Sequence, residues 1–444
     1  MRESCDRAAV VRQRDVLWSW LPLALSWMLM AAELPALGAV VARLADPRIH
    51  LAAYGGVVFP LALIIEAPVI MLLSASTALC RNRASYRALW RYMMVMGGAL
   101  TLLHVLIAFT PLFDFIVNRV LHAPPEIVEP ARVGMRIMTP WTWTIAYRRF
   151  MQGIQIRFGH SRLVGFGSAV RLITNLSVLS FGYFIWKGPG IIVGTAAIAA
   201  GVTAEALFSH IATRPIINGA LCTADSGLPD ADVGLRAFLA FYIPLALTSL
   251  VVLLVNPIGT AAVARMPRAL DSLAAWPSVV GLMFLFRCSG LSLNEVVIAM
   301  LERPDSRSAV GQFSRRLSLF VTAAFALVVL TPLGLGWFTA VQNLSPSHAQ
   351  LGVTALFFGC VLPGATVLQN WYQGQLVYAR QTRAITEAIL IFFAVCFGLL
   401  MIGIKWGGAA GIMVFMTASS IAAILQTLWL KYRALGLEVA GAVT

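Results

Sequence analysis

Residues 20–57 read WLPLALSWMLMAAELPALGAVVARLADPRIHLAAYGGV, and residues 242–279 read YIPLALTSLVVLLVNPIGTAAVARMPRALDSLAAWPSV. The two stretches align without a gap at an offset of 222 residues. The matched pairs include Pro35 with Pro257, Arg43 with Arg265 and, at an offset of 221, Gln152-Gly153 with Gln373-Gly374. Hydrophobicity alone does not place prolines and arginines at matched positions, so the chain contains an internal duplication.

The composition around this repeat is that of a membrane protein. The 444 residues are 59% hydrophobic and only 12% charged, with a mean hydropathy of +0.82. Globular chains carry about 25% charged residues, so a soluble enzyme and a disordered protein are excluded. About 20 apolar residues cross a bilayer. Twelve stretches qualify: 16–41, 53–79, 88–111, 133–156, 163–186, 190–213, 235–263, 273–300, 317–338, 349–378, 384–404 and 408–430.

The repeat divides these spans into two sets of six. Because six is even, both halves enter the membrane from the same side, as in transporters built from parallel repeats. We therefore predict an all-α polytopic membrane protein with 12 transmembrane helices in two pseudo-symmetric six-helix lobes. The predicted parts are an N-tail (1–15), an N-lobe (16–213), a cytoplasmic linker (214–234), a C-lobe (235–430) and a C-tail (431–444).

Basic residues predict the orientation. One side of the membrane, which includes both termini, receives 23 Lys and Arg, whereas the other receives 9. By the positive-inside rule, both termini are cytoplasmic in an inner or plasma membrane. The same distribution explains the net charge of +14 without a nucleic-acid partner.

Sequence motifs for an enzyme are missing. The chain has no G-x-x-x-x-G-K-[ST] and no H-E-x-x-H, and its six cysteines are scattered. We therefore expect no metal, no cofactor and no disulfide framework. An intramembrane enzyme, the alternative from another class, would need converging nucleophile and base groups.

Carboxylates within spans are costly and mark candidate coupling sites. Such a group exchanges a proton or holds Na⁺, and the alternative is a paired or protonated structural residue. At an offset of 222 the counterparts of Glu33 and Glu66 are Val255 and Cys288, so the second half lacks both. The cation-coupling candidates are Glu33, Glu66 and Glu205.

A second set of residues has the chemistry to bind a substrate. Arg287 near mid-span would attract an anion in a water-filled cavity, and the alternative is an ion pair with Glu295. Aromatic rings beside guanidiniums suit flat or anionic organic ligands, and the alternative is lipid contact at the span end. The candidates are Arg287, Glu295, Trp141, Trp143, Tyr147, Arg148, Gln152, Asn256, Asn370 and Gln373. Pro35 and Pro257 are hinge candidates, with static kinks as the alternative.

Several motifs resemble the progressive ankylosis protein family. They are the Pro-Leu-Ala-Leu that opens each half, Leu-Ala-Ala-Tyr-Gly (51–55), Asn-Pro-Ile-Gly-Thr-Ala-Ala-Val-Ala-Arg (256–265) and Ala-Trp-Pro (275–277). That family is similar to MATE-type exporters of the multidrug/oligosaccharidyl-lipid/polysaccharide (MOP) flippase superfamily. The resemblance implies two lobes in a V around a central cavity, with export of organic anions or drugs. Glu33 near Pro35 looks like the acidic residue of MATE helix one, whereas the acidic set of the C-lobe has no clear match.

The functional prediction is a secondary-active exporter that works by alternating access. It would be coupled to H⁺ or Na⁺ and would move organic anions or amphipathic small molecules out of the cell. A lipid-linked saccharide flippase is the alternative within the superfamily. The expected partners are a small-molecule substrate and the lipid bilayer, and the expected state is a monomer.

Overall fold

A computed structural model describes residues 12–219, 221, 234–301, 306–379 and 381–439. The greater part of the predicted N-tail and linker, and residues 440–444 of the predicted C-tail, lie outside the described residues. Within the described ranges every regular element is a helix. The all-α prediction is therefore confirmed.

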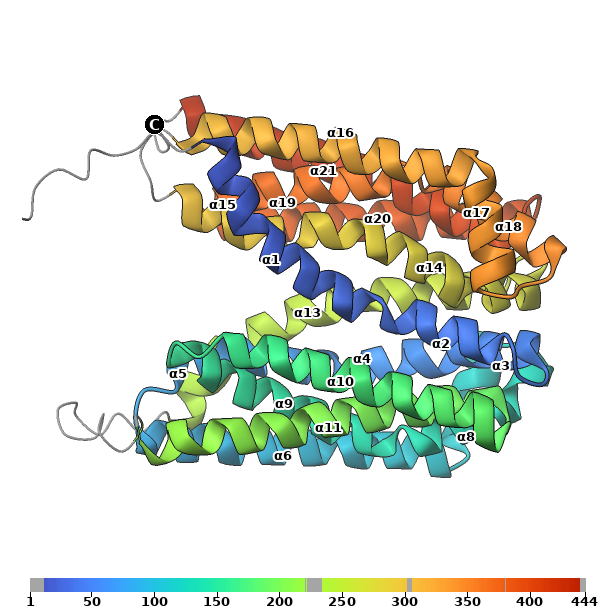
Figure 1. Cartoon of the computed structure of the whole chain (residues 1–444), viewed down its shortest axis with the longest axis horizontal. Coiled ribbons are helices and arrows are strands. Elements are labelled where there is room, and N and C mark those ends of the chain that lie inside the picture. Colours follow the sequence, from blue (N-terminus) through green and yellow to red (C-terminus); the bar gives the residue numbers. More distant parts are fainter. Residues whose placement is uncertain (1–11, 220, 222–233, 302–305, 380, 440–444) are drawn as a thin grey trace, which may run out of the picture. The chain divides into compact units, whose positions relative to one another are not determined.

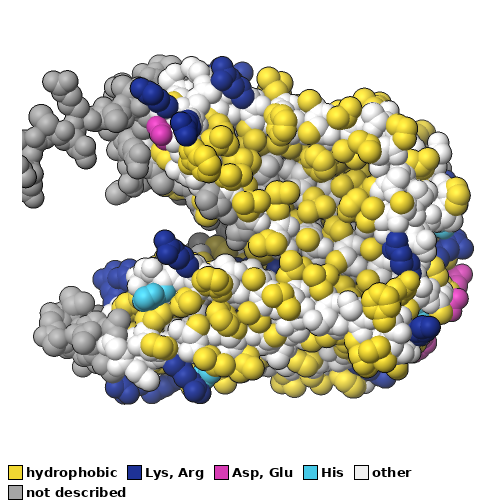
Figure 2. Space-filling view, viewed as in Figure 1, with side chains coloured by type: hydrophobic (Ala, Val, Ile, Leu, Met, Phe, Trp, Pro, Cys, Tyr) yellow, Lys and Arg dark blue, Asp and Glu magenta, His cyan; other side chains and the backbone are white. Residues whose placement is uncertain are grey.

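The helices follow the predicted spans. Ten helical stretches are long and apolar enough to cross a membrane. Two further stretches, α8–α9 and α13, correspond to the predicted spans 133–156 and 235–263, which brings the number to twelve. On the face that Figure 2 shows, hydrophobic side chains are spread widely over the surface and Lys and Arg occur in small groups.

The elements of the first repeat are α1 (Gln13–Ala31), α2 (Glu33–Val41), α3 (Pro47–Ala53), η1 (Tyr54–Val58), α4 (Phe59–Ile70), α5 (Leu72–Leu79), α6 (Arg83–Phe109), α7 (Leu112–Asp114), η2 (Phe115–Leu121), η3 (Pro125–Ile127), α8 (Val128–Ile137), α9 (Thr139–Arg157), α10 (Arg162–Phe181), η4 (Gly182–Trp186) and α11 (Gly190–Asn218). The elements of the second repeat are α13 (Leu235–Val263), α14 (Ala269–Leu291), α15 (Leu293–Leu301), α16 (Ser306–Leu330), α17 (Pro332–Gly336), η6 (Trp337–Val341), α18 (Pro346–Phe358), α19 (Leu362–Tyr378), α20 (Thr382–Trp406) and α21 (Gly411–Val439).

The chain forms two compact units. The first unit contains Met1–Pro35 and Ser278–Thr444, and the second contains Ala36–Pro277. In the first unit α1 packs against α15 and α16 (Figure 1), and Trp20 contacts their shared apolar core. In the second unit α9 packs against α5, α6 and α11, and α13 packs against α4. The lobe boundaries drawn from the repeat stay a prediction.

Several helix breaks lie just before a proline. α1 ends at Ala31 and α2 begins at Glu33, four and two residues before Pro35. Proline has no N–H, and its ring clashes with the carbonyl four residues earlier. Pro140 and Pro363 lie in the same way just after the α8–α9 and α18–α19 breaks. Pro257, by contrast, lies within the continuous α13.

The duplication is visible in side-chain geometry. Arg43 donates from Nη1 to the Ala39 carbonyl, and Arg265 donates from Nη1 to the Ala261 carbonyl, both at 2.7 Å. Thr110 and Thr331, which are 221 residues apart, both have extended backbone, and the hydroxyl of each bonds the carbonyl four residues earlier. The two repeats therefore share local structure as well as sequence.

Matched glycines mark the tight helix contacts of both repeats. A Cβ on Gly153 in α9 would collide with Ser76 and Leu73 of α5. A Cβ on Gly374 in α19 would collide with Val297 of α15. Only glycine permits these close approaches, which is the packing reason for the matched Gln-Gly pairs.

One extra residue in the first repeat changes the register between the two repeats. η1 is a π-helical turn in the first repeat, whereas the corresponding part of α14 is regular α-helix. A π-turn accommodates one additional residue. After it, the helix break at Met71 corresponds to the break at Ser292, an offset of 221. The counterpart of Glu66 is therefore Arg287, and the assignment to Cys288 at offset 222 is wrong.

Candidate functional site

A buried group of charges lies in the second unit. Arg148 of α9 donates from Nη1 to Glu205 Oε2 of α11 at 2.6 Å, and Gln152 Nε2 donates to Glu205 Oε1 at 3.0 Å. Arg171 of α10 lies 3.5 Å from the same Oε2. Glu205 is fully buried, and Arg148 is 3% exposed. The sequence candidates Arg148, Gln152 and Glu205 thus meet in one network.

Glu66 and Arg149 lie beside this network. Glu66 of α4 is 5% exposed, and its Oε2 has no hydrogen-bond partner among the described residues. Its electrostatic neighbours are Arg149, then Arg148 and Arg171. With three arginines and two glutamates, the group carries one excess positive charge when all are ionised.

The second repeat makes the corresponding contact without charge. At an offset of 221, Arg148 corresponds to Gln369 of α19, and Glu205 corresponds to Gln426 of α21. Gln369 Nε2 donates to the Ala423 carbonyl and to Thr427 Oγ1 of α21, both at 3.2 Å. A neutral amide that donates to a carbonyl and a hydroxyl therefore suffices at this contact between the two helices. Buried ion pairs are often no more stabilising than neutral replacements, so the charges of the second unit call for a function other than packing.

The aromatic candidates of α9 form a short chain of contacts. Trp143 and Tyr147 stack with ring centroids 5.1 Å apart. The Tyr147 hydroxyl lies 2.5 Å from His210 Nδ1, and Arg214 Nε donates to His210 Nε2 at 3.2 Å. Because the arginine donates, His210 Nε2 accepts and Nδ1 carries the proton in this arrangement. Trp141 is buried, and its indole N–H has no acceptor among the described residues.

A second polar group lies in the first unit. Arg287 of α14 donates from Nε to Thr366 Oγ1 of α19 at 2.9 Å. The Thr366 hydroxyl donates to the Leu362 carbonyl, and Asn370 Nδ2 donates to the Thr366 carbonyl at 2.8 Å. Arg287 and Asn370 thus both bond Thr366, Arg287 at its hydroxyl and Asn370 at its main-chain carbonyl.

The remaining candidates occupy other positions on the helices. Glu33 begins α2, directly after the helix break, and is partly buried. Asn256 in α13 and Gln373 in α19 are partly buried. The side chain of Glu295 lies outside the described residues, so its predicted pairing with Arg287 stays a prediction.

Sequence reasoning missed several members of the two groups. Arg149 resembles an ordinary basic residue near a span end, and Thr366 carries no charge that would mark it. Asn175 is 1% exposed, and neither of its amide atoms has a hydrogen-bond partner in the described structure. The one available signal for Arg171 was its position inside the predicted span 163–186.

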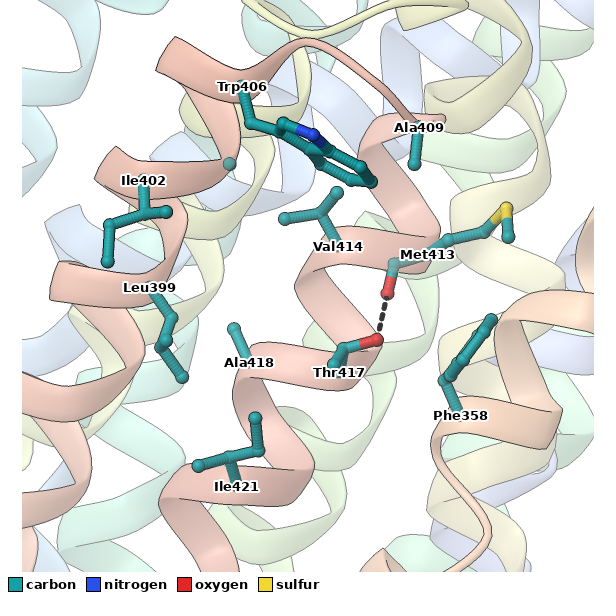
Figure 3. Close-up of a pocket in the computed structure, with 11 residues that line it drawn as sticks. Phe358, Leu399, Ile402, Trp406, Ala409, Met413, Val414, Thr417, Ala418 and Ile421 are labelled. Atoms are coloured by element: carbon teal, nitrogen blue, oxygen red, sulfur yellow. Dashed lines mark hydrogen bonds between the residues drawn. The ribbon is translucent and has the colours of Figure 1, made fainter.

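A separate cavity of about 410 Å³ is apolar. It lies between α20 and α21, with Phe358 of α18 at one side (Figure 3). Its one hydroxyl, Thr417 Oγ1, donates to the Met413 carbonyl of its own helix at 2.9 Å. Besides this hydroxyl, the lining residues have the indole N–H of Trp406 and no charged side chain, so the two polar groups are the better candidate sites.

Comparison with known proteins identifies the fold. No protein-family model and no curated protein sequence matches the chain. Among solved structures, it is similar to a multidrug resistance MATE family transporter of the MOP superfamily in an inward-facing conformation. That match has 15% identity and a TM-score of 0.71, and it covers 94% of this chain and 98% of the transporter.

Two further structures have the same fold. An outward-facing MATE family transporter matches with 15% identity and a TM-score of 0.66, over 98% of this chain and 99% of that one. The lipid II flippase MurJ, in an inward closed conformation, matches with 14% identity and a TM-score of 0.62, over 91% and 87%. The resemblance to the progressive ankylosis family stays a prediction. The chain is thus a multi-pass membrane protein with the fold of MOP superfamily transporters.

Proposed function

We propose that the protein is a secondary-active exporter that works by alternating access. The main support is the full-length similarity of fold to transporters seen in inward-facing and outward-facing conformations. The buried charges are the second support, because ionisable groups within spans mark ion and substrate pathways. We also propose that it is monomeric, with both termini in the cytoplasm.

Among the coupling candidates, the contacts favour Glu66. Glu205 is held by two arginines and a glutamine, so its negative charge is already compensated. Glu66 is also buried, yet one of its carboxylate oxygens lacks a partner among the described residues. A buried carboxylate without enough partners binds a proton or a cation. Glu33 stays a candidate from its place beside the α1–α2 break.

The charge balance favours an anionic solute. In the second unit three buried or partly buried arginines face two glutamates, and in the first unit Arg287 adds another positive charge. Positive charge in a low-dielectric site repels a cationic drug and attracts an organic anion. We therefore propose organic anions as the transported class, ahead of cationic drugs.

A lipid-linked saccharide flippase is the second candidate. It is favoured by the similarity of fold to the lipid II flippase MurJ. A saccharide that is joined to its lipid through phosphate is also an anion, so charge does not separate the two candidates. An intramembrane enzyme receives no support from the two buried polar groups, whose described residues do not pair a nucleophile with a general base.

Transport by purified protein in proteoliposomes tests the proposal. Wild type would be compared with Glu66→Gln, Glu33→Gln and the exposed control Glu126→Gln, under an imposed proton or sodium gradient. Labelled citrate and a cationic dye would be offered in parallel. We expect gradient-driven citrate movement that is lost in Glu66→Gln and retained in Glu126→Gln.

Other outcomes would redirect the proposal. Dye movement without citrate movement would contradict the anionic class. Citrate movement that persists unchanged in both Glu66→Gln and Glu33→Gln would contradict carboxylate coupling. Movement of a fluorescent lipid-linked saccharide, with neither solute transported, would favour the flippase.

A further inference from the structure

We infer that Arg287, Thr366 and Asn370 form a binding site for an oxyanion within the first unit, with Arg287 as its charged donor. The ligand group is a carboxylate or a phosphate. This inference deepens the proposed function by naming the charged group of the substrate. It rests on that function only in taking the bound anion to be the transported solute.

The site is built so that Arg287 is oriented but not neutralised. Thr366 is 2% exposed, and its hydroxyl proton is directed to the Leu362 carbonyl, so its oxygen accepts from Arg287 Nε. This bond directs the Nε–H of Arg287 toward α19. The two terminal nitrogens, each with two N–H donors, make no hydrogen bond to any described residue and remain available to a ligand.

No described carboxylate lies within ion-pair distance of Arg287. An arginine in the middle of a span is costly unless it faces water or a partner of opposite charge. Its one described partner is the neutral Thr366. The described residues around it therefore leave the counter-ion to be supplied from elsewhere, and a ligand can supply it.

The internal repeat shows where the protein omits that counter-ion. Glu66 and Arg287 are counterparts, and so are Arg149 and Asn370, both at an offset of 221. In the first repeat an acid at this place has a base as its principal electrostatic neighbour. In the second repeat the base Arg287 stands where the first repeat has the acid Glu66. The neutral amide of Asn370 stands where the first repeat has Arg149. In the first repeat these two positions carry opposite charges, whereas in the second they carry one positive charge and a neutral amide.

The geometry of the donors selects the ligand chemistry. A guanidinium presents parallel N–H groups that match the two oxygens of a carboxylate or phosphate. A soluble organic anion and the phosphate of a lipid headgroup share this chemistry. The inference covers both sources, and the experiment separates them.

Equilibrium binding to the full-length protein, measured by titration calorimetry in lipid nanodiscs, provides the test. The probes are citrate, pyrophosphate and the cation tetraphenylphosphonium. Discs of phosphatidylcholine would be compared with discs that contain phosphatidylglycerol, because an anionic lipid at the site would compete with the soluble probes. No gradient is present, so binding is measured apart from transport.

Two substitutions test the site from opposite directions. Arg287→Gln removes the donor, and Asn370→Asp supplies a counter-ion at almost constant volume. Each should weaken citrate or pyrophosphate binding about ten- to hundredfold, since charge-assisted hydrogen bonds are lost or already satisfied. The control Gln350→Glu adds an acid at an exposed position of α18 and should leave the affinity unchanged.

Two results would overturn the inference. One is citrate and pyrophosphate affinity that is the same in wild type, Arg287→Gln and Asn370→Asp, with all three folded by their thermal transitions. The other is anion binding that appears only in Glu295→Gln, because Glu295 would then be the counter-ion of Arg287. Binding that depends on Arg287 without any transport would contradict the proposed exporter and leave the oxyanion site in place.

Discussion

The ion pair between Arg148 and Glu205 gives the sharpest prediction about stability. Glu205→Gln removes one member and leaves Arg148 without its 2.6 Å partner in a buried position. Breaking a buried pair from one side costs about 3–5 kcal/mol. In a unit of this size, that loss corresponds to a fall of roughly 6–20 °C in Tm.

The double variant Arg148→Gln with Glu205→Gln should recover most of that loss. It copies the pair of amides, Gln369 and Gln426, that the second repeat has at the same two positions. It also returns the group to one excess positive charge, since one positive and one negative residue are removed together. Replacement of both members of a buried pair by well-packed neutral residues is often close to neutral.

Thermal unfolding of the purified single and double variants in detergent, followed by tryptophan fluorescence, measures both effects. The single variant Arg148→Gln completes a double-mutant cycle, from which the coupling energy follows directly. We expect a coupling energy of at least about 2 kcal/mol. We also expect a folded double variant that transports at least about tenfold more slowly, because the charges are assigned a functional role.

Two outcomes would refute this reasoning. The first is a Tm of the double variant as low as that of Glu205→Gln, since the second repeat would then be no guide to the first. The second is full transport by a stable double variant, since the buried charges would then be dispensable.

Two further predictions concern packing and hinge motion. Gly153→Ala and Gly374→Ala should each lower the free energy of unfolding by about 1–3 kcal/mol through overpacking. Gly98→Ala should not, because the space around its new Cβ is open. Thermal unfolding of the three variants measures this, and equal effects in all three would contradict the matched tight contacts. Pro35→Ala should slow transport severalfold while leaving citrate affinity unchanged, because it removes the break between α1 and α2. Pro257→Ala, within a continuous helix, should have less effect, and the reverse order in transport rates would count against Pro35 as the hinge.

Much of the fold was predictable because it depends on local chemistry. Apolar runs of about 20 residues determine spans in any bilayer. A proline such as Pro35 favours a helix break, although Pro257 lies within a continuous helix. The gapless match of residues 20–57 with 242–279 is enough to establish the duplication. The twelve helices and their two sets of six follow from these features.

The register beyond residue 57 was not predictable from the gapless match. The Gln-Gly match at an offset of 221 indicates one extra residue in the first repeat before Gln152, and the π-turn at Tyr54–Val58 shows where that residue is accommodated. The consequence was an incorrect counterpart for Glu66. The helix ends in the structure show that the counterpart of Glu66 is Arg287. The second repeat therefore has the opposite charge at this position, and not an uncharged cysteine.

The sequence by itself determined which groups are charged within the membrane, because a charge among apolar residues is visible in any window. Only the tertiary structure decided which of them compensate one another. Glu205 meets Arg148 from 57 positions away, and Arg287 meets Thr366 from 79 positions away. Helix packing sets these distances, and the free energy of a buried charge depends on what stands within a few ångströms of it.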